Sequence, residues 1–374
     1  MTRYTRREFS AAALAALASK ASAAAPDTAG EWRNRQSNMA YRRLGRTGYM
    51  LSEVICGGNT ISPANNRHVE LAIDMGLNYL DTAPAYGRGQ SESGYSSVVA
   101  GSKRDRVFLA TKVSLWDTNR NRLFKEIFDS LDAAEQKKLQ TAARDEIAAR
   151  RADAPDYFLN YFNGQLGELE AAALSNVLEQ RYGRRIDRAK NYRDLIIASV
   201  EESLGRLGTD HVDVLLCPHG ANTPSELRNF PEIFEAFEKL KKAGKVRHLG
   251  VSSHTDPGGV LQAAIDSKVY SMAMIAYNIC NHAYVDKALE QARRHDFGVI
   301  AMKVARPVWN GRAPERPDDA ARQALIQKAV PGDLKIPQKA YLWALRNPAV
   351  AAVNSEMVTA DHVRDNLPLA GRKA

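Results

Sequence analysis

Eight short apolar segments, each followed by a helical pattern, recur from about residue 50 to the end of this 374-residue chain. Segments that are almost wholly apolar are typical of strands buried on both faces, as in a parallel sheet. Eight such units predict an α/β fold of the (β/α)8 TIM-barrel type, and an open doubly wound sheet is the alternative. The expected strands are 53–57, 78–82, 107–113, 212–218, 246–251, 272–277, 297–303 and 350–353.

The helical patterns between these strands repeat apolar residues every three or four positions, with charged residues on the other face. No G-x-G-x-x-G motif opens a helix after the first strand, which argues against the doubly wound sheet. The expected helices are 67–75, 91–100, 192–207, 231–243, 260–267, 285–295, 337–345 and 360–367.

The connection after the third strand is much longer than a barrel needs. It carries an amphipathic face over 123–131, an aromatic cluster over 157–162 and a helical pattern over 166–178. We interpret 117–190 as a large helical insertion in a barrel that spans 26–374. The insertion is either a lid or partner surface on the catalytic face, or a structural elaboration away from the site.

The first 25 residues differ in composition from the rest of the chain. Arg6 and Arg7 precede an apolar run over 11–18, and an alanine-rich A-x-A pattern ends before Pro26. This order is typical of a secretory signal peptide, here over 1–25, and the paired arginines resemble a twin-arginine signal. A frayed Ala-rich helix is the alternative. The signal interpretation predicts a mature protein exported to the bacterial periplasm, with no stable membrane span.

Composition argues against several functional classes. The formal net charge of +9 is dispersed, and no Lys/Arg run is flanked by aromatic residues, so nucleic-acid binding is not indicated. The three cysteines, Cys56, Cys217 and Cys280, form no C-x-x-C pair, which argues against a disulfide framework or a metal cluster. The sequence does not indicate an oligomeric state.

Polar residues that follow the strands carry the candidate chemistry, because a barrel's active site lies at the C-terminal ends of its strands. Asp81, Tyr86, Lys112 and His219 follow strands two, three and four. A tyrosine titrates at about pH 10, so it donates a proton at neutral pH only where neighbours stabilise its anion. A lysine held by an aspartate would do so, and a histidine could hydrogen-bond a substrate oxygen. Together the four predict a general-acid site.

Five motifs resemble those of the aldo-keto reductase family. They are YRRLGRTG at 41–48, NYLDTAPAYG at 78–87, RVFLATKV at 106–113, SLGRLGTD at 203–210 and GKVRHLGVSS at 244–253. The resemblance covers 41–367 outside the insertion and implies a barrel that binds NAD(P)H. It implies that Tyr86 is the general acid, assisted by Lys112 and Asp81, and that His219 orients the substrate carbonyl. The nicotinamide would carry the hydride.

Several positions depart from the family's pattern around the nicotinamide. The family's Ser–Asn pair for the carboxamide reads Ser252–Ser253, and its Gln on the next strand is Met274. Its stacking Tyr is Met302, which is followed by Lys303. A methionine can still cover a ring face, but the loss of amide groups weakens recognition of the carboxamide.

The adenosine end departs as well, since the family's Gly and Arg become Glu356 and Val358. Because a glutamate repels a 2′-phosphate, the sequence favours NAD(H), with NADP(H) kept open. The residues expected to hold the cofactor are Gly58, Asn59, Ser252, Ser253, Met302, Lys303, Asp365 and Asn366.

The sequence thus predicts an exported NAD(P)-dependent oxidoreductase that interconverts a small carbonyl compound and an alcohol, a sugar-like compound being one candidate. The alternative is a barrel with weak or no turnover that binds a protein partner through its insertion. Met274, Met302 and Glu356 favour this alternative. The complete Asp81, Tyr86, Lys112 and His219 set favours the enzyme.

Overall fold

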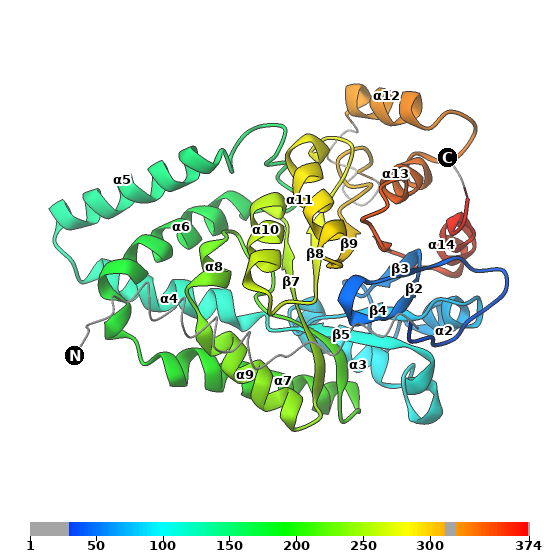
Figure 1. Ribbon diagram of the computed structural model, residues 1–374, viewed down its shortest axis with the longest axis horizontal. Helices are drawn as coiled ribbons and strands as arrows, with labels where there is room; N and C mark the ends of the chain where they lie inside the picture. Colours follow the sequence, from blue (N-terminus) through cyan, green and yellow to red (C-terminus); the bar gives the residue numbers. More distant parts are fainter. Residues whose placement is uncertain (1–29, 311–318, 373–374) are drawn as a thin grey trace.

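The computed structural model describes residues 30–310 and 319–372 and contains a closed barrel of eight parallel strands (Figure 1). This confirms the predicted (β/α)8 fold. The expected signal segment, 1–25, lies outside the described residues. Around the barrel the strands follow the order β10-β3-β4-β5-β6-β7-β8-β9. They are β3 (Val54–Gly57), β4 (Tyr79–Asp81), β5 (Phe108–Lys112), β6 (Val212–Leu216), β7 (Val246–Ser253), β8 (Met272–Ala276), β9 (Gly298–Met302) and β10 (Ala352–Ser355).

Successive residues of most barrel strands enter two different hydrophobic cores, because side chains alternate across a strand. On β5, Phe108 and Ala110 belong to the core inside the barrel, and Leu109 belongs to the core between barrel and helices. Lys112 lies two residues after Ala110, so the same alternation directs it toward the barrel axis. Asp81 lies two residues after Tyr79, another residue of the core inside the barrel, so its side chain is also directed toward the barrel axis.

Each helix expected around the barrel is present, with ends shifted by a few residues. One such shift has a clear cause: α10 starts at Pro257 because Asp256 caps it, accepting a hydrogen bond from the Gly259 amide. The helices are α2 (Arg67–Asp74), α3 (Gln90–Ser96), α7 (Leu195–Leu207), α9 (Pro231–Lys242), α10 (Pro257–Ser267), α11 (His282–Arg294), α13 (Ile336–Leu345) and α14 (Ala360–Asn366). Two further helices, α8 (Ser225–Arg228) and α12 (Ala320–Ala329), lie in connections.

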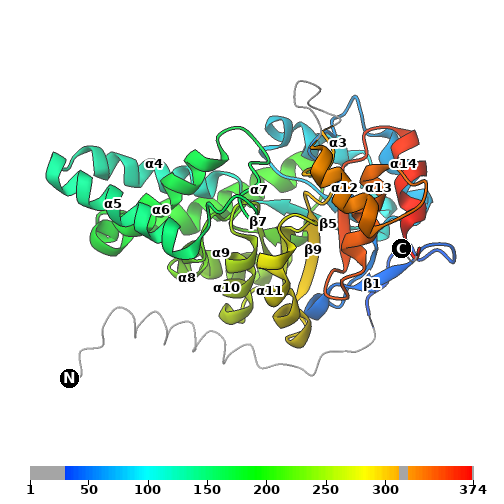
Figure 2. The same ribbon diagram turned by 90° about the horizontal axis from the view of Figure 1, so that it is seen from above.

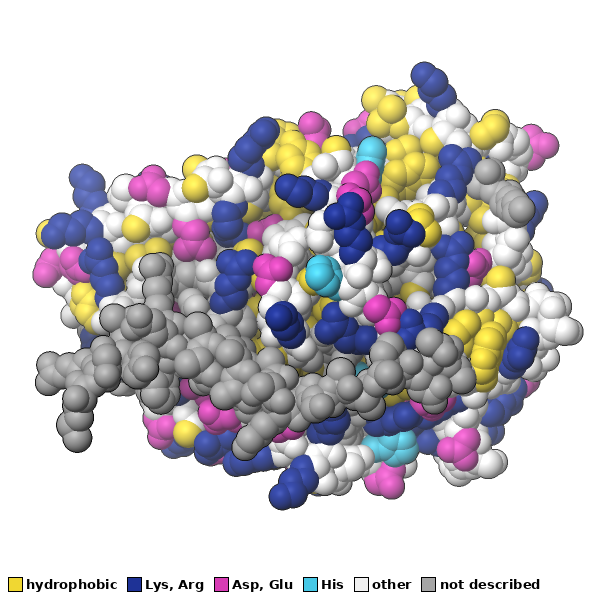
Figure 3. Space-filling view, viewed as in Figure 1, with side chains coloured by type: hydrophobic (Ala, Val, Ile, Leu, Met, Phe, Trp, Pro, Cys, Tyr) yellow, Lys and Arg dark blue, Asp and Glu magenta, His cyan; other side chains and the backbone are white. Residues whose placement is uncertain are grey.

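Three helices between β5 and α7 project to one side of the barrel (Figures 1 and 2). They are α4 (Leu115–Asp129), α5 (Ala133–Arg150) and α6 (Gln165–Tyr182), and α6 packs against the other two. Within the described ranges, no helix is long and apolar enough to cross a membrane. On the face shown in Figure 3, Lys and Arg side chains are interspersed with Asp and Glu side chains.

The N-terminal end of the barrel is closed by the hairpin of β1 (Tyr41–Arg43) and β2 (Met50–Ser52) and by the chain before it. Beside it, the fully buried Asp213 of β6 forms ion pairs with Arg33, Arg104 and Arg247. Burial alone would raise the pKa of Asp213, but the arginines and the Leu109 amide lower it below its ordinary value. This carboxylate is therefore a charged structural centre at the end of the barrel opposite the candidate chemistry.

Candidate active site

The structure brings Asp81 and Lys112 into direct contact at the C-terminal ends of β4 and β5. The Lys112 Nζ atom donates to Asp81 Oδ1 at 2.5 Å and to the Thr82 carbonyl oxygen at 2.8 Å. Both side chains are almost fully buried. A buried ammonium with two acceptors is fixed in place, and its remaining hydrogen is available to a third group.

Tyr86 lies beside this ammonium. The Lys112 Nζ atom is 4.6 Å from the centre of the Tyr86 ring. The chain reaches this position through a tight turn, Tyr86–Gly89, in which Gly87 has φ 58° and Arg88 has φ 55°. Two consecutive left-handed residues reverse the chain right after Tyr86, so its ring stays over the barrel mouth.

Burial and neighbouring charges shift the pKa values of Tyr86 and Lys112 in opposite directions. Burial raises the pKa of Tyr86, and the Lys112 charge opposes that rise. For Lys112, burial lowers the pKa, but Asp81 and Tyr86 outweigh it and raise the pKa overall. Lys112 is therefore a cation throughout the physiological range, and the Tyr86 anion would form beside a fixed positive charge.

His219 lies against Tyr86, with ring centres 5.7 Å apart and planes at 79°. Its Nδ1 atom is 2.7 Å from Ser114 Oγ. Burial, helped by the charges of Lys112 and Lys303, lowers the pKa of His219 well below its ordinary value. The imidazole is therefore neutral at physiological pH, with one N–H to donate. All four predicted catalytic residues thus meet at one end of the barrel.

The two serines expected to hold the carboxamide differ in whether their hydroxyl hydrogen is available to donate. Ser252 and Ser253 are both fully buried at the end of β7. Ser253 donates its hydroxyl hydrogen to the Ala221 carbonyl, so that hydrogen is committed inside the protein. Ser252 accepts from the Gly220 amide, which leaves its own hydroxyl hydrogen to donate.

The end of β3 has a packing role that the sequence did not indicate. A Cβ atom added to Gly58 would lie 2.1 Å from the Asp81 carbonyl oxygen, and the Gly58 carbonyl accepts from Ser91 Oγ. Gly58 therefore lets β3 approach the strand end that carries Asp81. The next residue, Asn59, is exposed.

Met302 and Lys303 lie at the end of β9. Met302 is part of the core inside the barrel, and Lys303 has φ 56°. Within 30–310 and 319–372, neither Lys303 nor nearby Arg306 has a hydrogen bond or ion pair to its charged end. Burial, together with Arg306, lowers the pKa of Lys303, while Glu356 opposes this. In the described part of the chain, both cations are therefore without an ion-pair partner.

The C-terminal pair predicted for the cofactor lies farther along the rim. Asp365 is ion-paired with Lys335 at 2.6 Å, and Asn366 donates to Ser355 Oγ at the end of β10. Only Asn366 therefore contacts a barrel strand.

The sequence interpretation missed Asn354 and His254. Asn354 on β10 opposes the rise that burial causes in the pKa of Asp81, and its Nδ2 atom donates to Met274 Sδ at 3.6 Å. The expected strand ended one residue earlier, at 353. His254 directly follows Ser253, and its pKa is lowered by burial and by the charges of Lys303, His219 and Lys112. Its place immediately after a strand was a signal that could have identified it.

The chain between α5 and α6 covers the ends of β7 and β8, which places this part of the long connection on the catalytic face. Tyr157 Oη donates to Asp256 Oδ1 at 2.6 Å, and Arg150 pairs with the same carboxylate. Tyr161 Oη accepts from Asn278 Nδ2 at 2.8 Å. Phe162 packs edge-on against His254, with ring centres 5.5 Å apart.

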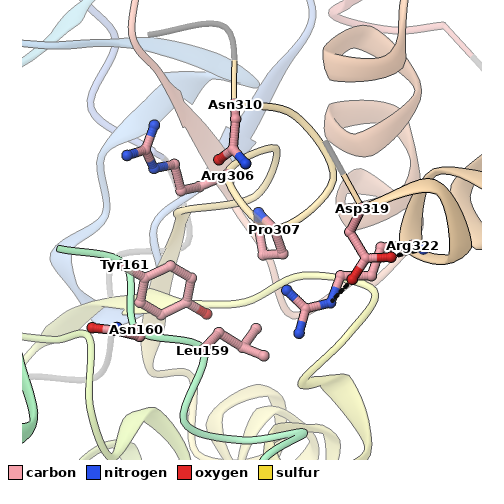
Figure 4. Close-up of a pocket in the computed structure, with 8 residues that line it drawn as sticks. All are labelled: Leu159, Asn160, Tyr161, Arg306, Pro307, Asn310, Asp319 and Arg322. Carbon is pink, nitrogen blue, oxygen red and sulfur yellow. Dashed lines mark hydrogen bonds and ion pairs between the residues drawn. The ribbon is translucent and has the colours of Figure 1, made fainter. Parts of the chain in front are cut away.

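A cavity of about 290 Å³ lies between this segment and the loop after β9 (Figure 4). Leu159, Asn160 and Tyr161 form one side, and the Asp319–Arg322 ion pair of α12 lies at the other. Arg306 contributes a charged group to the lining. The cavity is therefore polar and positively charged, and the long connection forms one of its walls.

A barrel with a buried tyrosine, lysine and aspartate beside a neutral histidine defines a protein suited to proton transfer at a carbonyl or hydroxyl oxygen. The family model described as the Aldo/keto reductase family matches residues 56–161 and 183–370. This chain belongs to that family and is an oxidoreductase. The match passes over 162–182, most of which is α6.

Relatives support the same assignment. The oxidoreductase YqkF of Bacillus subtilis is 25% identical over 357 residues, 90% of this chain and 92% of that protein. Oxidoreductase YdhF of Escherichia coli is 30% identical over 164 residues, 42% of this chain and 51% of that protein.

Solved structures share the fold. Aldo-keto reductase AKR11C1 from Bacillus halodurans matches with a TM-score of 0.58 and 22% identity, covering 90% of this chain and 92% of that chain. An aldo-keto reductase from Klebsiella pneumoniae, solved in complex with NADPH, has a TM-score of 0.57 and 19% identity, covering 90% and 91%.

Proposed function

We propose that this protein reduces a small carbonyl compound to an alcohol with a nicotinamide dinucleotide, and that Tyr86 is the proton donor. The observation that carries the proposal is the contact of Tyr86 with the buried Lys112–Asp81 ion pair. When bound, the nicotinamide supplies the hydride. The partner-binding alternative has no comparable observation, since the complete proton-transfer set lies in one place.

Each residue has a distinct part in this reaction. Tyr86 gives its hydroxyl proton to the carbonyl oxygen, and the Lys112 charge stabilises the phenolate that forms. Asp81 holds Lys112 in position and balances its charge. His219, neutral and next to Tyr86, donates a second hydrogen bond to the same oxygen. Two donors aimed at one oxygen favour the transition state, where negative charge develops there.

The groups beside the site fit a dinucleotide. Lys303 and Arg306, which have no ion-pair partner among the described residues, suit the pyrophosphate, because such cations bind phosphate oxygens through charge-assisted hydrogen bonds. Ser252 has a free hydroxyl hydrogen for the carboxamide oxygen. Glu356 lies close enough to Lys303 to oppose the lowering of the Lys303 pKa that burial causes. We propose that the charge of Glu356 disfavours a 2′-phosphate, so that NAD(H) binds more tightly than NADP(H).

The nucleotide preference can be measured directly. Titration calorimetry of the purified protein should give a Kd for NADH about 10-fold below that for NADPH, which is a difference in binding free energy of about 1.4 kcal/mol. Glu356→Gln should reduce the difference between the Kd values for NADH and NADPH. Lys303→Met should weaken the binding of both nucleotides by the same factor. Tighter binding of NADPH would contradict the role of Glu356 alone. Failure to bind either nucleotide would contradict the proposed function.

We propose that the segment between α5 and α6 forms a wall of the substrate site. Phe162 contacts His254, which lies near His219, so an aromatic side chain from the long connection borders the reacting groups. The Phe162 and Tyr86 rings and the His254 and His219 imidazoles form a surface that suits planar or apolar substrates. Aromatic aldehydes and sugar-like aldehydes are therefore the two classes to compare.

The second prediction tests this wall. Phe162→Ala should raise KM for an aromatic aldehyde about 10-fold and change kcat little, because it removes uniform binding. Leu166→Ala is the matched control, since Leu166 lies four residues on and is 48% exposed. Equal KM values for wild type and both variants would show that the segment does not contact substrate.

We also propose that the basic, alanine-rich segment over 1–25 directs export, with the mature protein acting in the periplasm. The support is the order of paired arginines, apolar run and A-x-A pattern. Fractionation of cells that express the full chain and an Arg6→Lys/Arg7→Lys variant tests this. A periplasmic wild type and a retained variant are expected.

A further inference from the structure

We propose that Ser114 is a positioning residue that decides which ring nitrogen of His219 carries the hydrogen. The residue directly precedes α4, two positions after Lys112. It was not among the residues that the sequence pattern identified. The inference rests on the proposed function for its catalytic consequence, but the hydrogen position itself can be measured without any turnover.

Ser114 Oγ has two neighbours. It lies 2.7 Å from His219 Nδ1, within hydrogen-bond distance, and it accepts a longer bond, 3.3 Å, from the Ala85 amide. Ala85 immediately precedes Tyr86. One hydroxyl therefore connects the turn that carries the proton donor with the ring that lies beside it.

Counting hydrogens assigns the direction of the Ser114–His219 bond. A serine hydroxyl has one hydrogen and two lone pairs. The Ala85 amide uses one lone pair, and among the described residues no group other than His219 Nδ1 lies within hydrogen-bond distance to accept the hydroxyl hydrogen. If Nδ1 carried the ring hydrogen, the serine hydrogen would have no protein acceptor. The arrangement that satisfies every group from within the protein has Ser114 donating to an unprotonated Nδ1.

The neutral state of the ring makes this assignment consequential. A histidinium would carry a hydrogen on both ring nitrogens, so Ser114 could not select between two tautomers. Burial and the nearby Lys112 and Lys303 charges keep His219 neutral, so it has a single N–H. With Nδ1 as acceptor, that hydrogen is on Nε2, the nitrogen that has no partner among the described residues.

The consequence for the reaction is a fixed second donor. Nε2–H can donate to a substrate oxygen, whereas an unprotonated Nε2 would present a lone pair and repel it. Because Ser114 is also tied to the Ala85 amide, the ring and the Tyr86 turn keep their relative position. Ser114 thus orients the donors without touching the substrate.

The direct test is ¹⁵N NMR of the imidazole nitrogens in wild-type protein with labelled histidine at neutral pH, with His219 assigned from His219→Gln. The expected spectrum shows a protonated Nε2 and an unprotonated Nδ1. In Ser114→Ala the single tautomer should give way to a mixture of the two. A protonated Nδ1 in the wild type, or an unchanged tautomer in Ser114→Ala, would overturn the proposal.

Kinetics separate positioning from general damage. Ser114→Ala should lower kcat for aldehyde reduction about 10-fold, with the Kd for nucleotide unchanged. Ser114→Thr keeps the hydroxyl and should restore most of this loss. Equal losses in both variants would overturn the proposal, since a hydroxyl would then not be the group that matters. If the wild type reduces no aldehyde, the proposed function fails, and the NMR result still decides the tautomer.

Discussion

Carbonyl reduction by Tyr86→Phe is expected to be about 1000-fold slower than by the wild-type protein, while nucleotide binding and the unfolding midpoint stay the same. The substitution removes only the hydroxyl and keeps the ring that the Lys112 ammonium contacts. Without it, the developing oxyanion keeps the His219 hydrogen bond but receives no proton from the barrel. Stopped-flow measurement of NADH oxidation with an aldehyde, calorimetric binding of NADH and thermal unfolding followed by circular dichroism give the three quantities.

Tyr95→Phe is the matched control, because Tyr95 is a fully buried tyrosine on neighbouring α3 whose hydroxyl lies 3.9 Å from Cys56 Sγ. Its loss should leave turnover unchanged. If Tyr86→Phe keeps wild-type turnover, Tyr86 is not the proton donor. If neither wild type nor variant turns over any carbonyl compound but both fold, the partner-binding alternative gains the support it now lacks.

The barrel could be predicted because local patterns determine it. Each strand is buried on both faces, and each helix has one apolar face, so eight repeats of the two patterns define the architecture. The predicted catalytic residues follow from the same rule, since Asp81 and Lys112 lie at the C-terminal ends of two of these apolar segments. Their contact needed only the fact that neighbouring parallel strands end at one rim.

Other features of the site depend on contacts between distant segments and could not be predicted. The position of the long connection is determined by Asp256, which binds Arg150 and Tyr157 from more than 90 residues away. The hydrogen bond from the Ser253 hydroxyl to the Ala221 carbonyl, 32 residues away, is a second contact of this kind. No periodicity in a single sequence reports such pairings.

Asp213→Asn is expected to lower the free energy of unfolding at pH 7 by about 3 to 5 kcal/mol, because removing one partner of a buried ion pair leaves the other uncompensated. Asp213 is fully buried and pairs with three arginines. Arg33 and Arg247 keep Glu31 as a partner, whereas buried Arg104 is left without a carboxylate partner in the described part of the chain. Urea unfolding monitored by circular dichroism measures the change. Asp210→Asn, whose side chain is 94% exposed, is the control and should unfold like the wild type.

The difference in free energy of unfolding between wild type and Asp213→Asn should change with pH, whereas a simple packing defect would give a constant difference. The pKa of Asp213 is lower in the folded protein than its ordinary value, so the unfolded chain binds its proton more readily. The stabilisation is therefore complete above a pH of about 4, the pKa of an unfolded aspartate, and is lost as pH falls through the lower folded value. The difference between wild type and Asp213→Asn should shrink on acidification across that window. A difference that stays constant down to the acid limit would mean that the asparagine disturbs packing and that the charge contributes little.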